Sequence, residues 1–267
     1  MTSSILSDAQ VEQFWLDGVL CIRGLFTDWV EPMRAAVDEV LARPGALAID
    51  LGNGAGSPRQ AERDRFYIEL GLWDRYPWFH SLATESPAVA IADRILGGSG
   101  VNLFFDQLFV KEPGSEQQRT PWHQDQPYWP ISGNDVVSVW VTADAVTSET
   151  GALRYVRGSH RWDEFYRPYT FGSTTTPVRG IGGADIPDID AHPEQYEFLT
   201  WDLEPGDCVV HQGRAIHGGP GNSSPERRRR AYSIRYTGDD VRWDPRPGIL
   251  ENITMMTTRP IGLQPGD

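Results

Sequence analysis

A histidine and a carboxylate lie two residues apart in the segment 122–126, as His123 and Asp125. The segment reads as extended, and side chains at positions i and i+2 of a strand point to the same face. The two side chains can therefore close on one metal ion, and an imidazole with a hard carboxylate oxygen suits Fe(II) when a second histidine arrives from elsewhere. A His-x-Asp tripeptide alone is more commonly a surface histidine beside a solvated carboxylate, so the prediction depends on finding that second histidine.

Four later histidines are available for this role. His160 lies in a Gly-Ser-His turn, and His192 precedes a proline in a loop. His211 and His217 are better placed, because His211 ends a short buried strand and His217 begins the glycine-rich run 218–222. Glycines of this kind allow the backbone to approach a metal site closely. Position alone leaves both His211 and His217 as candidates.

Composition limits the classes of protein that fit. The chain has 267 residues, 39% hydrophobic and 11% aromatic, which is enough to bury a large core in one domain. The net charge of -13 argues against a nucleic-acid groove or an anionic membrane surface as the main partner. Cys21 and Cys208 are too few for a disulfide framework or a zinc cluster. We find neither a signal segment at 1–10 nor an apolar run long enough to span a membrane, and we expect a cytoplasmic protein of unspecified oligomeric state.

The elements that must position the histidines fall into two groups. Residues 7–10 have the form of a capping box and begin a helix over 8–17, a second helix follows Thr27 or Asp28 and ends at Pro44, and a third covers 87–96. After residue 100 the pattern changes to short strands at 101–111, 136–141, 153–156, 196–201, 208–211 and 229–237. Helices followed by many short strands indicate an α+β fold in which helices cover one face of a β-sandwich or barrel.

Two segments of the N-terminal part have a less definite prediction. Residues 45–64 are rich in glycine and poor in large apolar side chains, so we expect a loop that is either a plain connection or a substrate lid. Residues 65–80 are rich in aromatic side chains, which we expect to build core, with one or two of them lining a cavity.

Several short motifs occur in one order along the chain. They are Gln107 and Lys111 on one strand, Thr120-Pro121-Trp122-His123-Gln124-Asp125, Val139-Trp140-Val141-Thr142-Ala143-Asp144, Glu149-Thr150-Gly151-Ala152-Leu153 before Gly158-Ser159-His160, and His217-Gly218 with Asn222 and an arginine beyond. Because of these motifs and their order, the sequence resembles the phytanoyl-CoA dioxygenase family of Fe(II)- and 2-oxoglutarate-dependent oxygenases. The resemblance covers roughly residues 10–237. The resemblance implies a double-stranded β-helix, or jelly-roll, core at about 101–240 with N-terminal helices at about 1–100 packed on one sheet. With a tail at 241–267, these parts form one predicted domain, 1–267.

The resemblance also implies a metal site and a reaction. His123, Asp125 and His217 would be the catalytic iron ligands, leaving three positions for 2-oxoglutarate and O₂. His211 is similar to a histidine that some family members carry six residues before the ligand, and we expect it to be structural. The expected reaction removes hydrogen from a small molecule, most simply to hydroxylate it, and releases succinate and CO₂.

The distal carboxylate of 2-oxoglutarate requires a cation with a fork of donors, as guanidinium supplies. The four consecutive arginines 227–230 are candidates. Arg229 shares strand phase with the small residues Ala231 and Ser233, which would leave room inside a barrel, whereas Arg228 shares phase with bulky residues. We therefore choose Arg229, with Arg228 as the alternative. The other residues expected at the cosubstrate are Thr120, Gln107 and Trp140.

Substrate contacts are predicted from position alone, at Trp129, Tyr128, Asp106 and Arg214. The resemblance implies a small-molecule substrate, as in the secondary metabolism that many bacterial members serve. Ring closure, epimerisation or desaturation remain alternatives to hydroxylation, because each begins with hydrogen abstraction. A cupin-type metal enzyme without 2-oxoglutarate and a non-catalytic small-molecule-binding barrel also remain open. No Gly-x-Ser-x-Gly motif supports a serine hydrolase.

Overall fold

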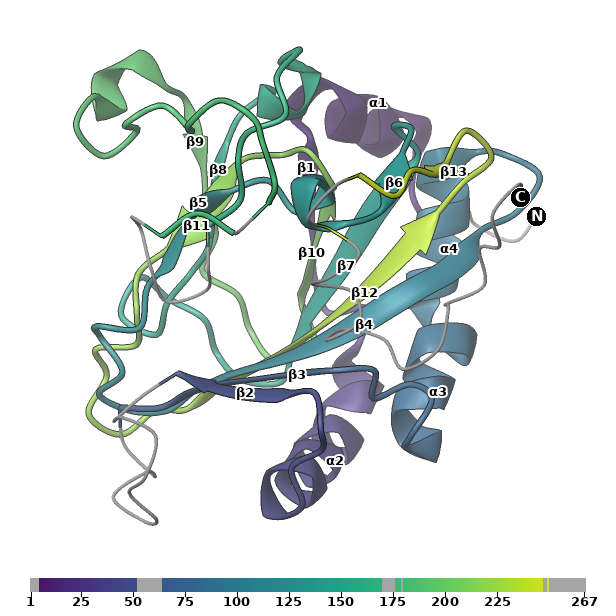
Figure 1. Ribbon diagram of the computed structural model, residues 1–267. Coiled ribbons are helices and arrows are strands. Elements are labelled where there is room, and N and C mark those ends of the chain that lie inside the picture. The colour runs from purple at the N-terminus through teal and green to yellow at the C-terminus, as the bar shows by residue number, and fades with distance from the viewer. Residues whose placement is uncertain (1–4, 52–63, 170–175, 179, 247–248, 250–267) are drawn as a thin grey trace.

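The computed structural model describes residues 5–51, 64–169, 176–178, 180–246 and 249. Two antiparallel β-sheets face each other, and helices cover the outer face of the larger one (Figure 1). The larger sheet has the order β1 (Val19–Ile22), β10 (Cys208–Gln212), β7 (Val136–Thr142), β12 (Arg229–Thr237), β4 (Asn102–Lys111), β3 (Phe66–Leu70) and β2 (Ala48–Leu51). The smaller sheet has the order β5 (Thr120–His123), β11 (His217–Gly219), β8 (Arg154–Val156) and β9 (Phe198–Leu199). A separate pair consists of β6 (Ile131–Ser132) and β13 (Arg242–Trp243).

The path of the chain is that of a double-stranded β-helix. From β4 onward it alternates between the sheets, with β4, β7, β10 and β12 in the larger sheet and β5, β8 and β11 in the smaller one. These core strands alternate between the two sheets, so that β4 pairs with β12 and β5 with β11, whereas the short β9 pairs with its predecessor β8. The predicted α+β class with a jelly-roll core is confirmed, whereas the single domain remains a prediction.

In the described part of the chain, four α-helices precede this core: α1 (Asp8–Asp17), α2 (Val30–Ala42), α3 (Pro77–Glu85) and α4 (Pro87–Leu96). The capping box of α1 is formed, because the Ser7 hydroxyl accepts from the Gln10 amide and the Gln10 side chain accepts from the Ser7 amide. Gly18 ends α1 with a positive φ of 82°, which a side chain would strain. The predicted helices over 8–17 and 87–96 are confirmed at both ends. None of the described helices is long and apolar enough to cross a membrane.

The two faces of the larger sheet have different tasks. On β12, Tyr232 and Ile234 point to the helix side and are fully buried in the core shared with α2, α3 and α4. Ala231 and Ser233 point to the space between the sheets. Because burying a large apolar side chain contributes about 1.5–3 kcal/mol, the helix layer holds the outer face of the sheet in place. The inner face can therefore carry polar groups.

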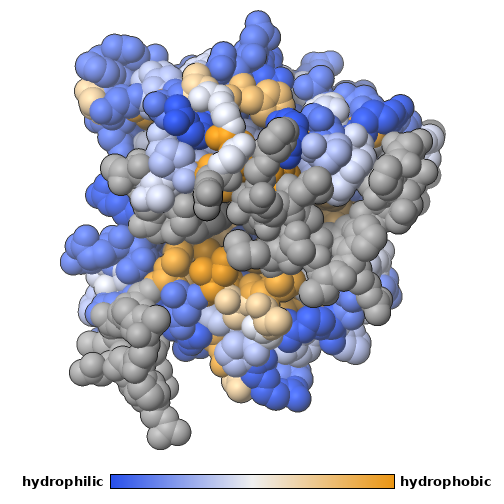
Figure 2. All heavy atoms as spheres, in the orientation of Figure 1, coloured by the Kyte–Doolittle hydropathy of each residue, from blue (hydrophilic) through white to orange (hydrophobic). Residues whose placement is uncertain are grey.

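The space between the sheets combines apolar clusters with buried charge. One cluster contains Val19, Trp140, Val146, Ala152, Tyr155, Leu203, Val209 and Ala231. The other contains Phe66, Ile68, Leu70, Phe104, Phe105, Tyr128, Trp129, Ile131, Val136 and Val241. Imidazole, carboxylate and guanidinium groups are buried with them, although unpaired buried charge is costly. Apolar surface is also visible between the two sheets, within a mostly hydrophilic exterior (Figure 2).

The structure differs from the sequence prediction in three segments. The predicted loop 45–64 contains β2, and its residues 52–63 lie outside the described part of the chain. The aromatic segment 65–80, for which no helix or strand was predicted, forms β3 and the start of α3. Its expected role is confirmed, because Phe66, Tyr67 and Phe79 are buried in the core and Phe66 also lines the pocket. The predicted strand 196–201 is reduced to β9.

Candidate metal centre and adjoining pocket

His123 and His217 are brought together by strand pairing. The two residues are direct partners in the antiparallel register of β5 and β11. Opposed residues of an antiparallel pair project from the same face of the sheet, and here that face is the interior. The ring centroids lie 4.2 Å apart, and both side chains are buried. The fold thus supplies the second histidine as the cross-strand neighbour of the first.

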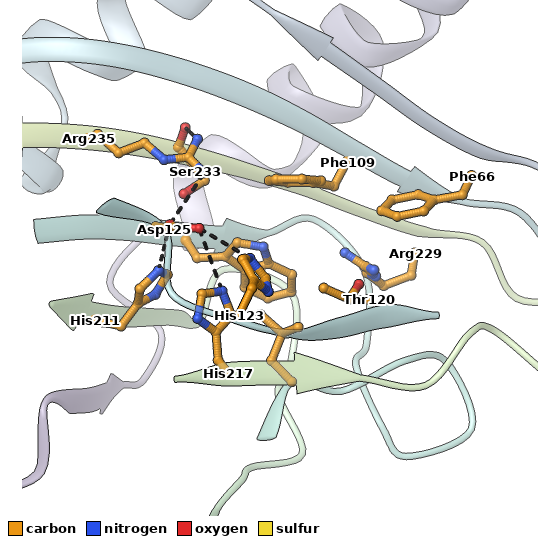
Figure 3. Close-up of a pocket in the computed structure, with 12 residues that line it drawn as sticks. Phe66, Phe109, Thr120, His123, Asp125, His211, His217, Arg229, Ser233 and Arg235 are labelled. Atoms are coloured by element: carbon orange, nitrogen blue, oxygen red, sulfur yellow. Dashed lines mark hydrogen bonds and ion pairs between the residues drawn. The ribbon is translucent and has the colours of Figure 1, made fainter. Parts of the chain in front are cut away.

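The backbone at Asp125, which brings its carboxylate next to the two histidines, is not the extended strand that the sequence predicted. Strand β5 ends at His123, and Asp125 has helical backbone angles, φ -74° and ψ -46°, at the start of the 3₁₀ turn Gln126–Tyr128. The rule that i and i+2 share a face of a strand therefore does not explain the pairing. A turn after the strand places the carboxylate beside the two rings (Figure 3).

The three side chains present their ligand atoms to one point. The Asp125 Oδ1 atom lies 3.3 Å from Nε2 of His123 and 3.9 Å from Nε2 of His217, and the three candidate ligand atoms lie within 4.8 Å of one another. Nδ1 of His123 lies 2.8 Å from the Pro121 carbonyl, and Nδ1 of His217 lies 3.0 Å from that of Ala215. Each Nδ1–H donates to its carbonyl, which leaves the Nε2 lone pair for a metal.

Protonation favours metal binding at this point. Burial acts to raise the pKa of Asp125, but the adjoining imidazoles of His123 and His211 and further positive charge hold that pKa well below its usual value. Burial, followed by the neighbouring His123, lowers the pKa of His217 well below its usual value. Asp125 is therefore a carboxylate and His217 a neutral imidazole at neutral pH. These are the deprotonated forms in which such side chains bind metals.

His211 lies outside the group of three. Its Nε2 atom is 3.3 Å from Oδ2 of Asp125, the oxygen that does not face His123 and His217. Its Nδ1 atom is 3.3 Å from the hydroxyl of Tyr155. The structure therefore places His211 beside the candidate ligand Asp125 rather than among the ligands.

Two buried cations lie at the other end of the pocket or next to it, where Arg229 lines the pocket and Lys111 contacts the lining residue Thr120. The Arg229 guanidinium stands over the Trp140 ring at 5.4 Å, and the Lys111 ammonium lies 3.3 Å from Thr120 Oγ1 and 2.6 Å from the Pro220 carbonyl. Among the described residues, no carboxylate forms an ion pair with either cation, and Arg229 Nε has no hydrogen-bond partner. Burial lowers the pKa of Arg229 to about 10, and burial together with the charge of Arg229 lowers that of Lys111. A bound anion would relieve both groups.

The remaining arginines of the run 227–230 point elsewhere. Arg227 pairs with Glu149, Arg228 with Glu112 and Asp38, and Arg230 with Asp144 and Asp38. Only Arg229 of the four lines the pocket, where it shares a face of β12 with Ser233. The strand-phase argument thus placed this side chain where the structure has it. Thr120 and Trp140 line the same pocket.

Asp106 and Gln107 lie on opposite faces of β4. Asp106 accepts hydrogen bonds from the amides of Leu72 and Trp73, at 3.0 and 2.9 Å, and from the hydroxyl of Tyr232, all on the helix side. The expectation that Asp106 contacts the substrate is therefore wrong, because adjacent residues of a regular strand cannot both face the pocket. Gln107 faces the interior, but its Oε1 accepts from Arg235 at 3.0 Å and it does not line the pocket around Arg229.

The other three predicted substrate residues lie near the metal motif without lining this pocket. Tyr128 stands edge-on to His123, with ring centroids 6.0 Å apart, and Trp129 packs on Phe105 with centroids 5.3 Å apart. Arg214 lies farther out, where it donates to the Trp162 carbonyl. Tyr128 and Trp129 thus border the site, whereas the Arg214 side chain is held by its hydrogen bond to the Trp162 carbonyl.

Sequence reasoning missed several pocket residues. Arg235 and Phe109 line the pocket, and Ser138 lies 3.4 Å from Asp125 Oδ2. Phe66 also lines the pocket and belongs to the aromatic segment 65–80, from which one or two cavity residues were expected. Arg235 could have been found, because it continues the two-residue period of Arg229 along β12. The positions of Phe109 and Ser138 depend on the order of strands within the larger sheet, which a single sequence does not reveal.

Comparisons with known proteins agree with this site. The sequence profile described as "Phytanoyl-CoA dioxygenase (PhyH)" matches residues 14–231. The chain is 29% identical over 242 residues to a protein named multifunctional dioxygenase prhA from Penicillium brasilianum, covering 86% of this chain and 71% of that protein. For several other curated fungal dioxygenases, the chain spans only 45% to 55% of their length.

Solved structures give the same fold. The carbocyclase SnoK from nogalamycin biosynthesis, described as non-heme and alpha-ketoglutarate-dependent, superposes with a TM-score of 0.74 at 22% identity, covering 100% of this chain and 96% of SnoK. The epimerase SnoN, crystallised with Fe3+, alpha-ketoglutarate and nogalamycin RO, superposes with a TM-score of 0.72 at 21% identity, covering 97% of this chain and 93% of SnoN. At these identities the likeness establishes the jelly-roll fold. Because the profile match spans most of the chain, the protein belongs to the phytanoyl-CoA dioxygenase family.

Proposed function

We propose that the protein is an Fe(II)- and 2-oxoglutarate-dependent oxygenase that oxidises a small organic molecule, most simply by hydroxylation, with release of succinate and CO₂. One observation carries the proposal. A set of two histidines and one carboxylate shares a pocket with the buried Arg229, and the buried Lys111 contacts Thr120 of the pocket lining; neither cation has a carboxylate partner among the described residues. A dicarboxylate cosubstrate bound to the metal would give these cations the anionic partner that the described residues do not supply.

The donor set fits Fe(II). Two neutral imidazoles and one carboxylate on one side of a metal, with the remaining positions open, form the ligand set of non-haem Fe(II) oxygenases. His123, Asp125 and His217 supply these donors, and the carbonyls of Pro121 and Ala215 fix the two ring orientations. In this role the backbone of the smaller sheet sets the direction of the ligands.

The other end of the pocket fits the distal carboxylate of 2-oxoglutarate. Arg229 offers a planar fork of donors, including an Nε–H that has no partner among the described residues, and Lys111 adds a second positive charge. Thr120 holds its hydroxyl next to Lys111. We assign the cosubstrate to Arg229, Lys111 and Thr120, with Trp140 as the wall beneath the guanidinium. Gln107 is not part of this assignment.

Bound Fe(II), with 2-oxoglutarate and O₂, supplies an oxidant that removes hydrogen from a C–H bond of the substrate. The chain's own contribution is to hold the ligands, to neutralise the cosubstrate and to keep water out. Phe66, Phe109 and Leu153 line the same pocket as the histidines and Arg229, and such apolar surroundings strengthen the charge interactions within it.

The names of the relatives support a small-molecule substrate. SnoN is an epimerase crystallised with nogalamycin RO, SnoK is a carbocyclase, and prhA is a multifunctional dioxygenase. Ring closure or epimerisation by the present protein would use the same ligands and the same cosubstrate. The choice among these outcomes depends on the position of the substrate radical, which the residues named above do not determine.

A matched pair of arginine variants tests the proposal. Arg229→Met removes the guanidinium assigned to the cosubstrate, whereas Arg228→Met removes one that pairs outside the pocket. Truncating one partner of a buried charge pair costs about 2–5 kcal/mol, so we expect 2-oxoglutarate affinity to fall at least about 30-fold in Arg229→Met and to stay near the parent value in Arg228→Met. Calorimetric titration with 2-oxoglutarate under anaerobic conditions measures both. Equal affinities in the two variants would contradict the assignment.

A further inference from the structure

The two oxygens of Asp125 face different surroundings. Oδ1 faces the two histidines of the candidate metal centre, whereas Oδ2 faces the larger sheet. On that side lie Nε2 of His211 at 3.3 Å and Nη2 of Arg235 at 3.7 Å (Figure 3), together with Oγ of Ser138 at 3.4 Å. We call His211, Ser138 and Arg235 the donor row, because His211 and Ser138 can donate hydrogen bonds to Oδ2 and the Arg235 guanidinium forms an ion pair with it.

The donor row is built into the register of the sheet. His211 on β10 is the direct partner of Ser138 on β7, and Ser138 is the direct partner of Arg235 on β12. Cross-strand partners project from the same face, so the three side chains stand side by side toward the interior. All three are at most 3% exposed. Their approach to Asp125 therefore follows from three central strands rather than from a loop.

The hydrogen positions on His211 follow from its two neighbours. A carboxylate only accepts, so Nε2 of His211 must carry the hydrogen that points to Oδ2. In the neutral ring Nδ1 is then an acceptor, and the Tyr155 hydroxyl at 3.3 Å donates to it. The Tyr155 ring also stacks on His217, with centroids 5.3 Å apart and an interplanar angle of 21°. At the other end of the row, Gln107 accepts from Arg235 at 3.0 Å.

We propose that the donor row occupies Oδ2 of Asp125, so that this residue binds the metal through Oδ1 alone, and that His211 is the main positioning residue. A carboxylate with both oxygens free can take two metal positions. Donors on Oδ2 prevent this and keep a position open for the other reactants. The part of this inference that concerns iron rests on the proposed function. The contacts of His211 and Ser138 with Oδ2 of Asp125 are present without a metal.

A role for His211 as a fourth metal ligand makes a different prediction. In that case Nε2 would have to turn from Oδ2 toward the point shared by the other ligand atoms, and the set of described residues that meets there contains only His123, Asp125 and His217. Replacement of His211 by glutamine distinguishes the two roles. If His211 is a hydrogen-bond donor, the glutamine amide can donate to Oδ2 in its place. If His211 is a metal ligand, the neutral amide oxygen is a poor substitute for the imidazole.

The test compares His211→Gln with His211→Leu, using Co(II) alone as the probe. Loss of a group that orients a ligand typically weakens metal affinity about 10- to 100-fold. We expect that loss in His211→Leu, together with a changed Co(II) absorption spectrum as Oδ2 becomes free to bind. We expect His211→Gln to retain the parent spectrum and most of the affinity. Far-ultraviolet circular dichroism of the metal-free proteins provides the control for folding.

Two results would overturn the inference. Parent-like Co(II) affinity in His211→Leu would show that the donor is not needed, and an equal loss in both variants would show that His211 acts as a ligand or by shape. If His211→Leu does not fold, Ser138→Ala removes a smaller donor from the same row and should weaken Co(II) about 2- to 10-fold with the same spectral change. Absence of Co(II) binding by the parent protein would instead contradict the proposed function.

Discussion

Two buried aspartates, on opposite sides of the larger sheet, have opposite electrostatic states. Asp106 lies on the helix side, where burial raises its pKa to about 6 despite hydrogen bonds from Tyr232 and two backbone amides. Asp125 lies on the pocket side, where burial is outweighed by His123, His211 and further positive charge, and its pKa is well below the usual value. Burial alone therefore does not identify a functional carboxylate. The surrounding donors decide whether the negative charge is kept, and a metal ligand requires it.

The two residues also have opposite effects on stability against pH. The folded-state pKa of Asp106 is raised above its ordinary value of 3.8, so stability falls as pH rises from about 4 to about 6 and the unfolded chain ionises first. The folded-state pKa of Asp125 is depressed, so without metal its contribution is present above the ordinary value and is lost as pH falls through the folded pKa. Three substitutions test this contrast.

The largest effect is expected for Asp125→Asn. The change keeps the shape of the side chain but removes the negative charge of the carboxylate, which the surrounding groups stabilise. Fe(II) affinity should therefore fall by more than about 100-fold, and turnover should be lost. Anaerobic Fe(II) titration measures the affinity, and circular dichroism checks that the fold is retained. Iron affinity equal to that of the parent protein would remove Asp125 from the ligand set.

Asp106→Asn should affect stability and leave iron binding unchanged. Asparagine keeps an acceptor for the amides of Leu72 and Trp73 but cannot ionise. A pKa displaced by about two units corresponds to about 3 kcal/mol, so the parent protein should lose about that much unfolding free energy, relative to the variant, between pH 4 and pH 7. Urea unfolding of both proteins at the two pH values measures the difference. Parallel pH dependences would show that Asp106 is ionised in the fold as easily as in solution.

The smallest effect is expected for Tyr232→Phe, which removes the hydroxyl that donates to Asp106. The ring stays packed on Phe79, so the loss is confined to one hydrogen bond, about 1 kcal/mol at neutral pH. It should be smaller at pH 4, where Asp106 is protonated in the fold. The double variant with Asp106→Asn should lose the pH dependence, and an undiminished effect at pH 4 would mean that the hydroxyl acts through packing.

Sequence periodicity predicted the elements whose patterns are local. The Ser7 capping box and the Pro87 helix start fix α1 and α4, and the alternation along β12 separated Arg229 from Arg228. The same alternation could have separated Asp106 from Gln107, since neighbours on one strand face opposite sides. The sequence alone therefore showed that Asp106 and Gln107, as neighbours on one strand, could not both contact molecules bound in the pocket.

Features that depend on strand order could not be predicted in this way. The donor row joins residues 138, 211 and 235 only because β7 lies between β10 and β12. From the sequence, Asp125 was placed beside His123 on the assumption that the segment is an extended strand. The structure also has the two side chains together, but a turn at Asp125 rather than a strand places them so. The residue types indicated the chemistry, whereas the topology determines which oxygen of Asp125 faces His123 and His217.

The most direct test of the proposed site is an anaerobic titration of the metal-free protein, first with Fe(II) and then with 2-oxoglutarate, followed by visible absorption. Binding of the oxo acid to iron held by His123, Asp125 and His217 should produce a weak charge-transfer band that saturates with 2-oxoglutarate. Bound iron without such a band would contradict the role given to Arg229 and Lys111, and failure to bind iron would contradict the metal centre itself.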